Sequence, residues 1–144
     1  MRDRFGFDAG TRKLEEALAF AARHGFRFVD FNADLGPNSL DQWDERRAQQ
    51  VREICRREGI SIGVHTSSAV NMAEVAPYVS EAVDRYLEEN IRLAGRLGAR
   101  WVVVHGGYHF SGDVERRKEA AIQRLKRALG WAEEAGVPLW LENH

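Results

Sequence analysis

Two histidines and a glutamate stand at matching points of this sequence, each at the end of a short apolar run. His65 closes the run from 61 to 65, His105 closes the run from 101 to 105, and Glu142 follows Leu141. His65 and His105 are 40 residues apart, and His105 and Glu142 are 37 apart. Imidazole nitrogens and carboxylate oxygens bind Zn²⁺, Mn²⁺, Co²⁺ or Mg²⁺, and such an ion polarises a carbonyl or activates water. The spacing therefore predicts a divalent metal site, if the runs are neighbouring strands.

A repeated unit positions these residues. Four glycines each follow a charged amphipathic stretch and precede an apolar run, and their separations are 34, 39 and 38 residues: Gly25, Gly59, Gly98 and Gly136. Each glycine is placed to take the left-handed conformation that ends a helix. The runs are short and rich in β-branched or aromatic residues, which is typical of buried strands. The expected strands cover residues 5–8, 26–31, 60–64, 101–104 and 137–141.

The alternation of strands and helices predicts an α/β fold with a parallel sheet and right-handed crossovers. An open doubly wound sheet and a (β/α)₈ barrel of about 250 residues both satisfy it. No Gly-x-Gly-x-x-Gly loop follows the first strand, so a dinucleotide-binding sheet has little support. We expect an incomplete TIM-type barrel, with about four βα units plus a fifth strand in sequential order. Ser39 and Gln42 form a capping-box pattern that predicts the start of a helix running to about Arg57.

Equivalent positions of adjacent parallel strands point the same way, so His65, His105 and Glu142 are expected to share one rim. A single histidine at a strand end is more often a hydrogen-bonded structural residue than a ligand. The matched register of all three favours a joint function. We interpret Glu142, His65 and His105 as catalytic, with Glu142 as metal ligand and the two histidines as further ligand candidates. Four nearby residues are predicted to bind substrate or support a ligand: Asp30, Asn32, His109 and Asn143.

Composition limits the partners. The chain has 144 residues, enough for one domain with its own core, here taken as residues 1–144. Its 21 basic and 22 acidic residues give a net charge of -1, which favours neither nucleic acid nor a membrane surface as partner. One cysteine, Cys55, allows no internal disulfide and fits a reducing compartment. No signal peptide or membrane span is apparent in the sequence, so we expect a cytoplasmic protein.

Three motifs carry a resemblance to a known family. They are Val64-His65-Thr66-Ser67, Val104-His105-Gly106-Gly107 and Leu141-Glu142-Asn143. With them, the sequence resembles the xylose isomerase-like barrel superfamily. Its members include sugar phosphate isomerases and epimerases, hydroxypyruvate isomerase, tagatose epimerase-like enzymes and the family-2 apurinic endonucleases. The resemblance covers nearly the whole chain, but only the N-terminal portion of a family member.

The resemblance implies roles for the three residues. Glu142 matches the strand-five glutamate that binds the divalent metal (Mn, Co, Mg or Zn) and, in epimerase-like members, shuttles a proton. His65 and His105 match histidines that contact substrate in the isomerases and bind zinc in the endonucleases. The implied function is a sugar (phosphate) isomerase or epimerase, acting by metal-dependent proton transfer next to a carbonyl. The alternatives are an apurinic endonuclease-like phosphodiester hydrolase and a non-catalytic half-barrel fragment.

The family's other ligands, on strands six to eight, have no counterpart in these 144 residues. We therefore expect the chain alone to bind a divalent metal weakly and to show little isomerase activity. The expected small-molecule partner is a sugar or sugar phosphate. Two open sheet edges invite association unless they are covered, so the missing barrel half or a homo-oligomer is the expected protein partner.

Overall fold

The computed structural model describes residues 5–108 and 113–143, so His109 and His144 lie outside the described residues. Strands and helices alternate along the chain as expected. The strands are β1 (Gly6–Asp8), β2 (Phe28–Phe31), β3 (Ser61–His65), β4 (Trp101–His105) and β5 (Leu139–Glu142). The helices are α1 (Leu14–His24), α2 (Glu45–Glu58), α3 (Pro77–Leu97) and α4 (Val114–Ala135), with short 3₁₀ turns η2 (Gly36–Asn38) and η3 (Leu40–Gln42). None of the helices described is long and apolar enough to cross a membrane.

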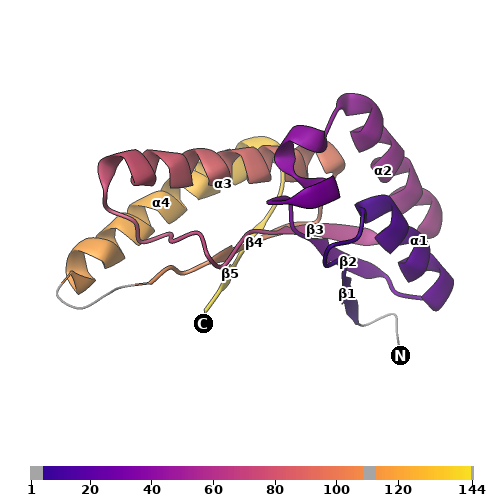
Figure 1. Ribbon diagram of the computed structural model, residues 1–144, viewed down its shortest axis with the longest axis horizontal. Helices are drawn as coiled ribbons and strands as arrows, with labels where there is room; N and C mark the ends of the chain where they lie inside the picture. Colours follow the sequence, from indigo (N-terminus) through magenta and orange to yellow (C-terminus); the bar gives the residue numbers. More distant parts are fainter. Residues whose placement is uncertain (1–4, 109–112, 144) are drawn as a thin grey trace.

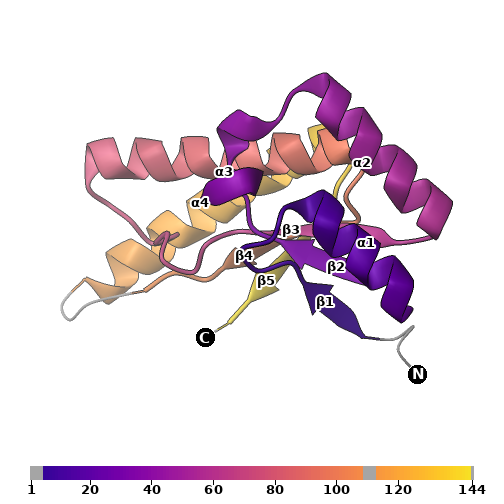
Figure 2. The same cartoon turned by 45° about the vertical axis from the view of Figure 1, so that its right-hand side comes forward.

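The five strands form one parallel sheet in the order β1-β2-β3-β4-β5. A doubly wound sheet would reverse its strand order and carry helices on both faces. Here the helices lie together over one face, and no helix of the described residues covers the other, which we call the bare face (Figures 1 and 2). The prediction of an α/β fold of the incomplete TIM-barrel type is therefore confirmed.

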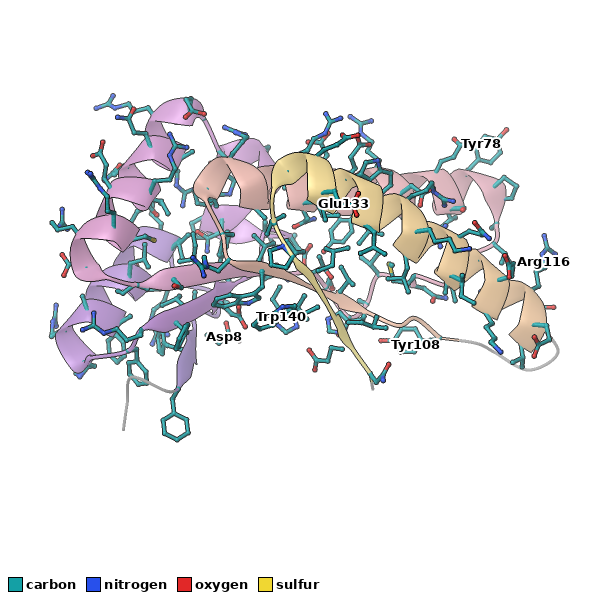
Figure 3. The ribbon with its side chains drawn as sticks, turned by 180° about the vertical axis from the view of Figure 1, so that it is seen from behind. Asp8, Tyr78, Tyr108, Arg116, Glu133 and Trp140 are labelled. Carbon is teal, nitrogen blue, oxygen red and sulfur yellow. The ribbon has the colours of Figure 1, made fainter. Side chains whose placement is uncertain are left out.

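The core fills the space between the sheet and the helices. Successive strand residues point to opposite faces, and the apolar ones that face the helices are fully buried: Val29, Phe31, Ile62, Val64, Val102 and Val104. They pack against buried positions of the helices such as Leu18 and Ile91. The alternate strand residues occupy the bare face, where Figure 3 shows Asp8 and Trp140. Burial of one face thus leaves the polar strand-end residues on the other.

The helix ends follow the glycine prediction. The four glycines Gly25, Gly59, Gly98 and Gly136 have φ of 77°, 63°, 64° and 67°, and each caps the C-terminus of a helix. Side chains other than glycine rarely adopt this region, so the repeat seen in the sequence is a repeat of helix stops.

The predicted start of the second helix is wrong. Helix α2 begins at Glu45, because Asp44 takes the N-cap position and its carboxylate accepts a 2.7 Å hydrogen bond from the Arg47 N–H. Residues 39–42 form the 3₁₀ turn η3 instead. The extended backbone of Trp43 separates that turn from α2, and the buried Trp43 indole donates to the Asn38 carbonyl at 2.8 Å. Burial of Trp43 therefore overrides the capping-box pattern.

A close helix crossing generates the first prediction. A Cβ added at Gly95 on α3 would lie 2.9 Å from the Ala135 carbonyl oxygen of α4, whereas one at Gly130 would meet nothing within 4 Å. Gly95→Ala should lower the free energy of unfolding by about 1–3 kcal/mol, as overpacking does. Gly130→Ala, the matched control, should raise it by about 0.5–1 kcal/mol. Urea unfolding of both variants checks this, and a Gly95→Ala protein as stable as Gly130→Ala would contradict the close crossing.

Candidate metal centre

Three predicted ligands meet at the rim of the bare face. His65, His105 and Glu142 are the last residues of β3, β4 and β5, and His105 pairs with Glu142 in the β4–β5 register. One ligand atom from each residue lies within 4.8 Å of the other two. The parallel register therefore brings together residues that are far apart in the sequence.

The distance between two of the donor atoms matches that of two ligands of one ion. His65 Nε2 lies 3.3 Å from Glu142 Oε2. Two ligands of one tetrahedral ion, each bound at about 2.1 Å, are about 3.4 Å apart. The rings of His65 and His105 are tilted neighbours with centroids 5.2 Å apart. Two imidazoles and a carboxylate form a donor set that suits Zn²⁺, Mn²⁺ or Co²⁺.

The buried ring of His105 is oriented by the backbone. Its Nε2 lies 3.0 Å from the Thr66 carbonyl oxygen, which can only accept, so Nε2 carries the hydrogen. In a neutral ring the lone pair then resides on Nδ1, the nitrogen that a metal would bind. Thr66 is itself buried and fixed, because its hydroxyl donates to the Val103 carbonyl at 2.9 Å. A histidine ligand held by a carbonyl in this way has a defined tautomer and orientation.

A small polar cavity of about 310 Å³ opens at these three residues. Besides the three ligands, its lining comprises Asp8, Asn32, Thr66, Ser67 and Ser68. Hydroxyl, amide and carboxylate groups therefore surround the candidate metal site. No lysine or arginine is among the residues described as lining it. The cavity is of the size that holds a small molecule.

The residues predicted to bind substrate do not all lie at the same cavity. Asn32 lines the cavity, but Asp30 is not among the lining residues. One Asp30 oxygen accepts the Trp101 indole N–H, and the other lies 3.7 Å from His65 Nδ1. Asn143 lines a second, mostly apolar cavity of about 540 Å³ together with residues of α4. It follows Glu142 directly, and successive strand residues point to opposite faces. His109 lies outside the described residues, so its predicted role stays a prediction.

Some lining residues were not predicted from the sequence. Asp8 closes β1 and pairs with Asp30 in register, so the same strand-end argument applied to β1 would have found it. Ser67 and Ser68 follow β3 in a loop, where no periodic signal marks a residue as facing the cavity.

A partly buried hydroxyl connects two loops that line the cavity. Tyr86 of α3 donates to Asp34 at 2.5 Å and accepts the Ser67 N–H at 2.8 Å. The Asn32 side chain donates both to Asp34 and to the His65 carbonyl. Burial, followed by the hydrogen bond to Asp34, raises the pKa of Tyr86 far above its usual value, so the hydroxyl remains a donor. Tyr86 therefore ties the loops after β2 and β3 to the helix layer.

This contact gives a prediction with a natural control. Tyr86→Phe leaves Asp34 and the Ser67 N–H without their partner, which should cost about 1–3 kcal/mol of stability. The cavity loops should then exchange their amide hydrogens faster. Tyr78→Phe changes a side chain that is 88% exposed and should leave both measurements unchanged. Thermal unfolding and hydrogen exchange check this, and equal behaviour of the two variants would refute the role of Tyr86.

Comparison with known proteins agrees with the fold described above. Similar folds include a D-tagatose 3-epimerase-like protein, with TM-score 0.81 and 24% identity, covering 96% of this chain and 52% of that one. An L-ribulose 3-epimerase gives TM-score 0.77 and 19% identity, covering 95% and 48%. At such identities the likeness shows the fold. The chain spans about half the length of these structures.

A similar sequence and a family profile complete the comparison. A probable endonuclease 4 of Mycobacterium leprae is 27% identical over 101 residues, which is 70% of this chain and 38% of that protein. Residues 18–144 match the profile of the xylose isomerase-like TIM barrel family. The match includes all three residues of the candidate metal centre. The chain therefore belongs to the xylose isomerase-like TIM barrel family.

Proposed function

We propose that this chain carries part of the active site of a divalent-metal-dependent sugar isomerase or epimerase. The reaction would be proton transfer at a carbon next to a carbonyl. The observation that carries the proposal is the cluster of His65, His105 and Glu142 ligand atoms, all within 4.8 Å, beside a small polar cavity. Because the similar structures are about twice as long, the proposed activity is that of a whole barrel, to which these residues contribute.

The chemistry of the cavity supports an uncharged sugar as substrate. Asn32, Thr66, Ser67 and Ser68 offer hydroxyl and amide groups, which match the alternating donors and acceptors of a polyol. Asp8 and Glu142 add carboxylates, which repel a phosphate. We therefore place a free sugar ahead of a sugar phosphate.

Each of the three residues has a role in this proposal. A divalent ion, when bound, polarises the substrate carbonyl, so that the neighbouring C–H is more acidic. His105 is buried and rigidly oriented, so it holds its position during binding. His65 lies beside it and faces Glu142. The Glu142 side chain is 46% exposed, so its carboxylate can reach both ion and substrate and transfer the proton.

An apurinic endonuclease-like phosphodiester hydrolase is the second candidate. Two imidazoles with one carboxylate are a zinc-type donor set, and one similar protein is a probable endonuclease 4. A DNA substrate also needs cationic groups for its phosphates. The cavity lining instead contains two carboxylates and no lysine or arginine among its described residues, which favours the sugar.

The metal centre can be tested by substitution. His65→Ala, His105→Ala and Glu142→Gln should each weaken Co²⁺ binding by about tenfold or more, since each removes a ligand. Co²⁺ absorption titration measures this directly. His24→Ala, a histidine at the end of α1, is the control and should bind as the wild type does. Unchanged affinity in all three variants would remove the basis of the proposal.

The reaction type can be tested by isotope exchange. With Mn²⁺ in D₂O, the protein should slowly introduce deuterium next to the carbonyl of a ketohexose, even where net epimerisation is small. Glu142→Gln should abolish the exchange, because the carboxylate is the proposed proton carrier. Metal-dependent cleavage of abasic DNA without exchange would support the second candidate instead. If the protein catalyses neither reaction, the result would favour the non-catalytic half-barrel.

A further inference from the structure

Three residues of neighbouring strands form a row across the bare face below the rim. Asp30 of β2 pairs with Gly63 of β3, and Gly63 pairs with Trp101 of β4. The Trp101 indole lies across β3, and its Nε1 donates a 2.6 Å hydrogen bond to Asp30 Oδ1. A residue of β4 thus contacts a residue of β2, although a whole strand separates them.

Glycine at position 63 is what permits this contact. A Cβ added there would lie 1.9 Å from Trp101 Nε1, much closer than atoms can approach. The indole is also held from the β5 side, since it stacks on Trp140 with centroids 5.2 Å apart and planes 9° apart. Trp101 is therefore a fixed donor, and Asp30 is fixed by it.

The other oxygen of Asp30 faces the candidate metal centre. Asp30 Oδ2 lies 3.7 Å from His65 Nδ1, and His65 Nε2 on the opposite side of the ring lies 3.3 Å from Glu142 Oε2. Both ring nitrogens therefore face a carboxylate, and Glu142 is the nearer one. A cation bound to Nε2 and Glu142 would leave the ring hydrogen on Nδ1, where it faces Asp30.

We propose that Asp30 is a positioning residue of the metal centre. Its carboxylate faces the Nδ1–H that His65 carries when Nε2 binds a divalent cation beside Glu142, and so favours the ring in its metal-binding orientation and tautomer. Trp101 holds Asp30 in place, and Gly63 makes room for Trp101. This inference rests on the proposed metal site. It assigns to Asp30 a role through His65, in place of the substrate contact expected from the sequence.

The fixed indole makes a specific test possible. In Asp30→Asn, the Trp101 N–H requires the amide oxygen on its side, which turns the amide NH₂ toward His65 Nδ1. This amide donor opposes the Nδ1–H form of His65 that binds the cation, so metal binding should weaken. In the double variant Asp30→Asn with Trp101→Phe, the amide can turn over and accept from Nδ1–H. Metal binding through His65 should therefore be partly restored.

The state of the His65 ring is read from its ¹⁵N shifts in protein with a limiting amount of Zn²⁺, which is diamagnetic. The wild type should show a metal-bound Nε2 and a hydrogen on Nδ1. This state should be depleted in Asp30→Asn and return in the double variant, a loss and rescue that a general loss of structure would not produce. An undiminished metal-bound state in Asp30→Asn, with the fold intact in the amide spectrum, would overturn the proposal.

Co²⁺ affinity gives an independent measurement. Asp30→Asn should bind about 10–100-fold more weakly, as is typical when the partner of a histidine ligand is lost. It should cause no further loss in a His65→Ala background, because Asp30 acts through that ring. Asp41→Asn, an exposed carboxylate, is the control. An additional full loss in the His65→Ala background would make Asp30 itself a ligand and overturn the proposal.

The two measurements also separate this inference from the proposed function. A wild type that binds neither Co²⁺ nor Zn²⁺ through His65 would refute the metal site and the proposed function with it. Metal binding through His65 with no dependence on Asp30 would refute the inference and leave the proposed function standing.

Discussion

The register between neighbouring parallel strands decides where the side chains of this molecule lie. Because all five strands run the same way, their carboxyl ends meet at one rim, and His105 stands directly opposite Glu142. A slip of one residue would exchange the two faces of a strand. It would bury the rim residues under the helices and expose core residues such as Ile62 and Val102. The apolar burial that stabilises the fold therefore also fixes the geometry of the metal centre.

The rim differs from the rest of the surface in how its charges are balanced. On the helices, carboxylates pair with arginines, as Glu15 does with Arg47 and Asp84 with Arg124. At the rim, the described ion-pair partner of both Asp30 and Glu142 is the imidazole of His65. No lysine or arginine is a described ion-pair partner of either carboxylate, and a divalent cation bound to His65 and Glu142 would supply positive charge there. His65 thus has one carboxylate on each side, and this arrangement is more favourable with a bound cation than without one.

Much of the architecture follows from patterns that the sequence displays, and the remainder depends on packing. The glycine repeat predicts four helix ends and hence five strands, and the matched strand ends predict that His65, His105 and Glu142 meet. The role of Asp30 could not be read this way. It depends on Trp101, 71 residues away, lying across Gly63. The prediction of a helix start near Ser39 was wrong for a similar reason, because the burial of Trp43 determines the conformation of that segment. Local patterns predict elements, but contacts between distant side chains require the structure.

X-ray absorption spectroscopy of the protein loaded with Zn²⁺ or Co²⁺ tests the central claim most directly, because it observes the atoms bound to the ion. The account predicts imidazole scattering from two histidines and oxygen ligands at about 2.0–2.2 Å. His65→Ala and His105→Ala should each reduce the imidazole contribution by one ring. A bound ion with no imidazole scattering, or a spectrum that neither substitution alters, would contradict a metal centre built from His65, His105 and Glu142.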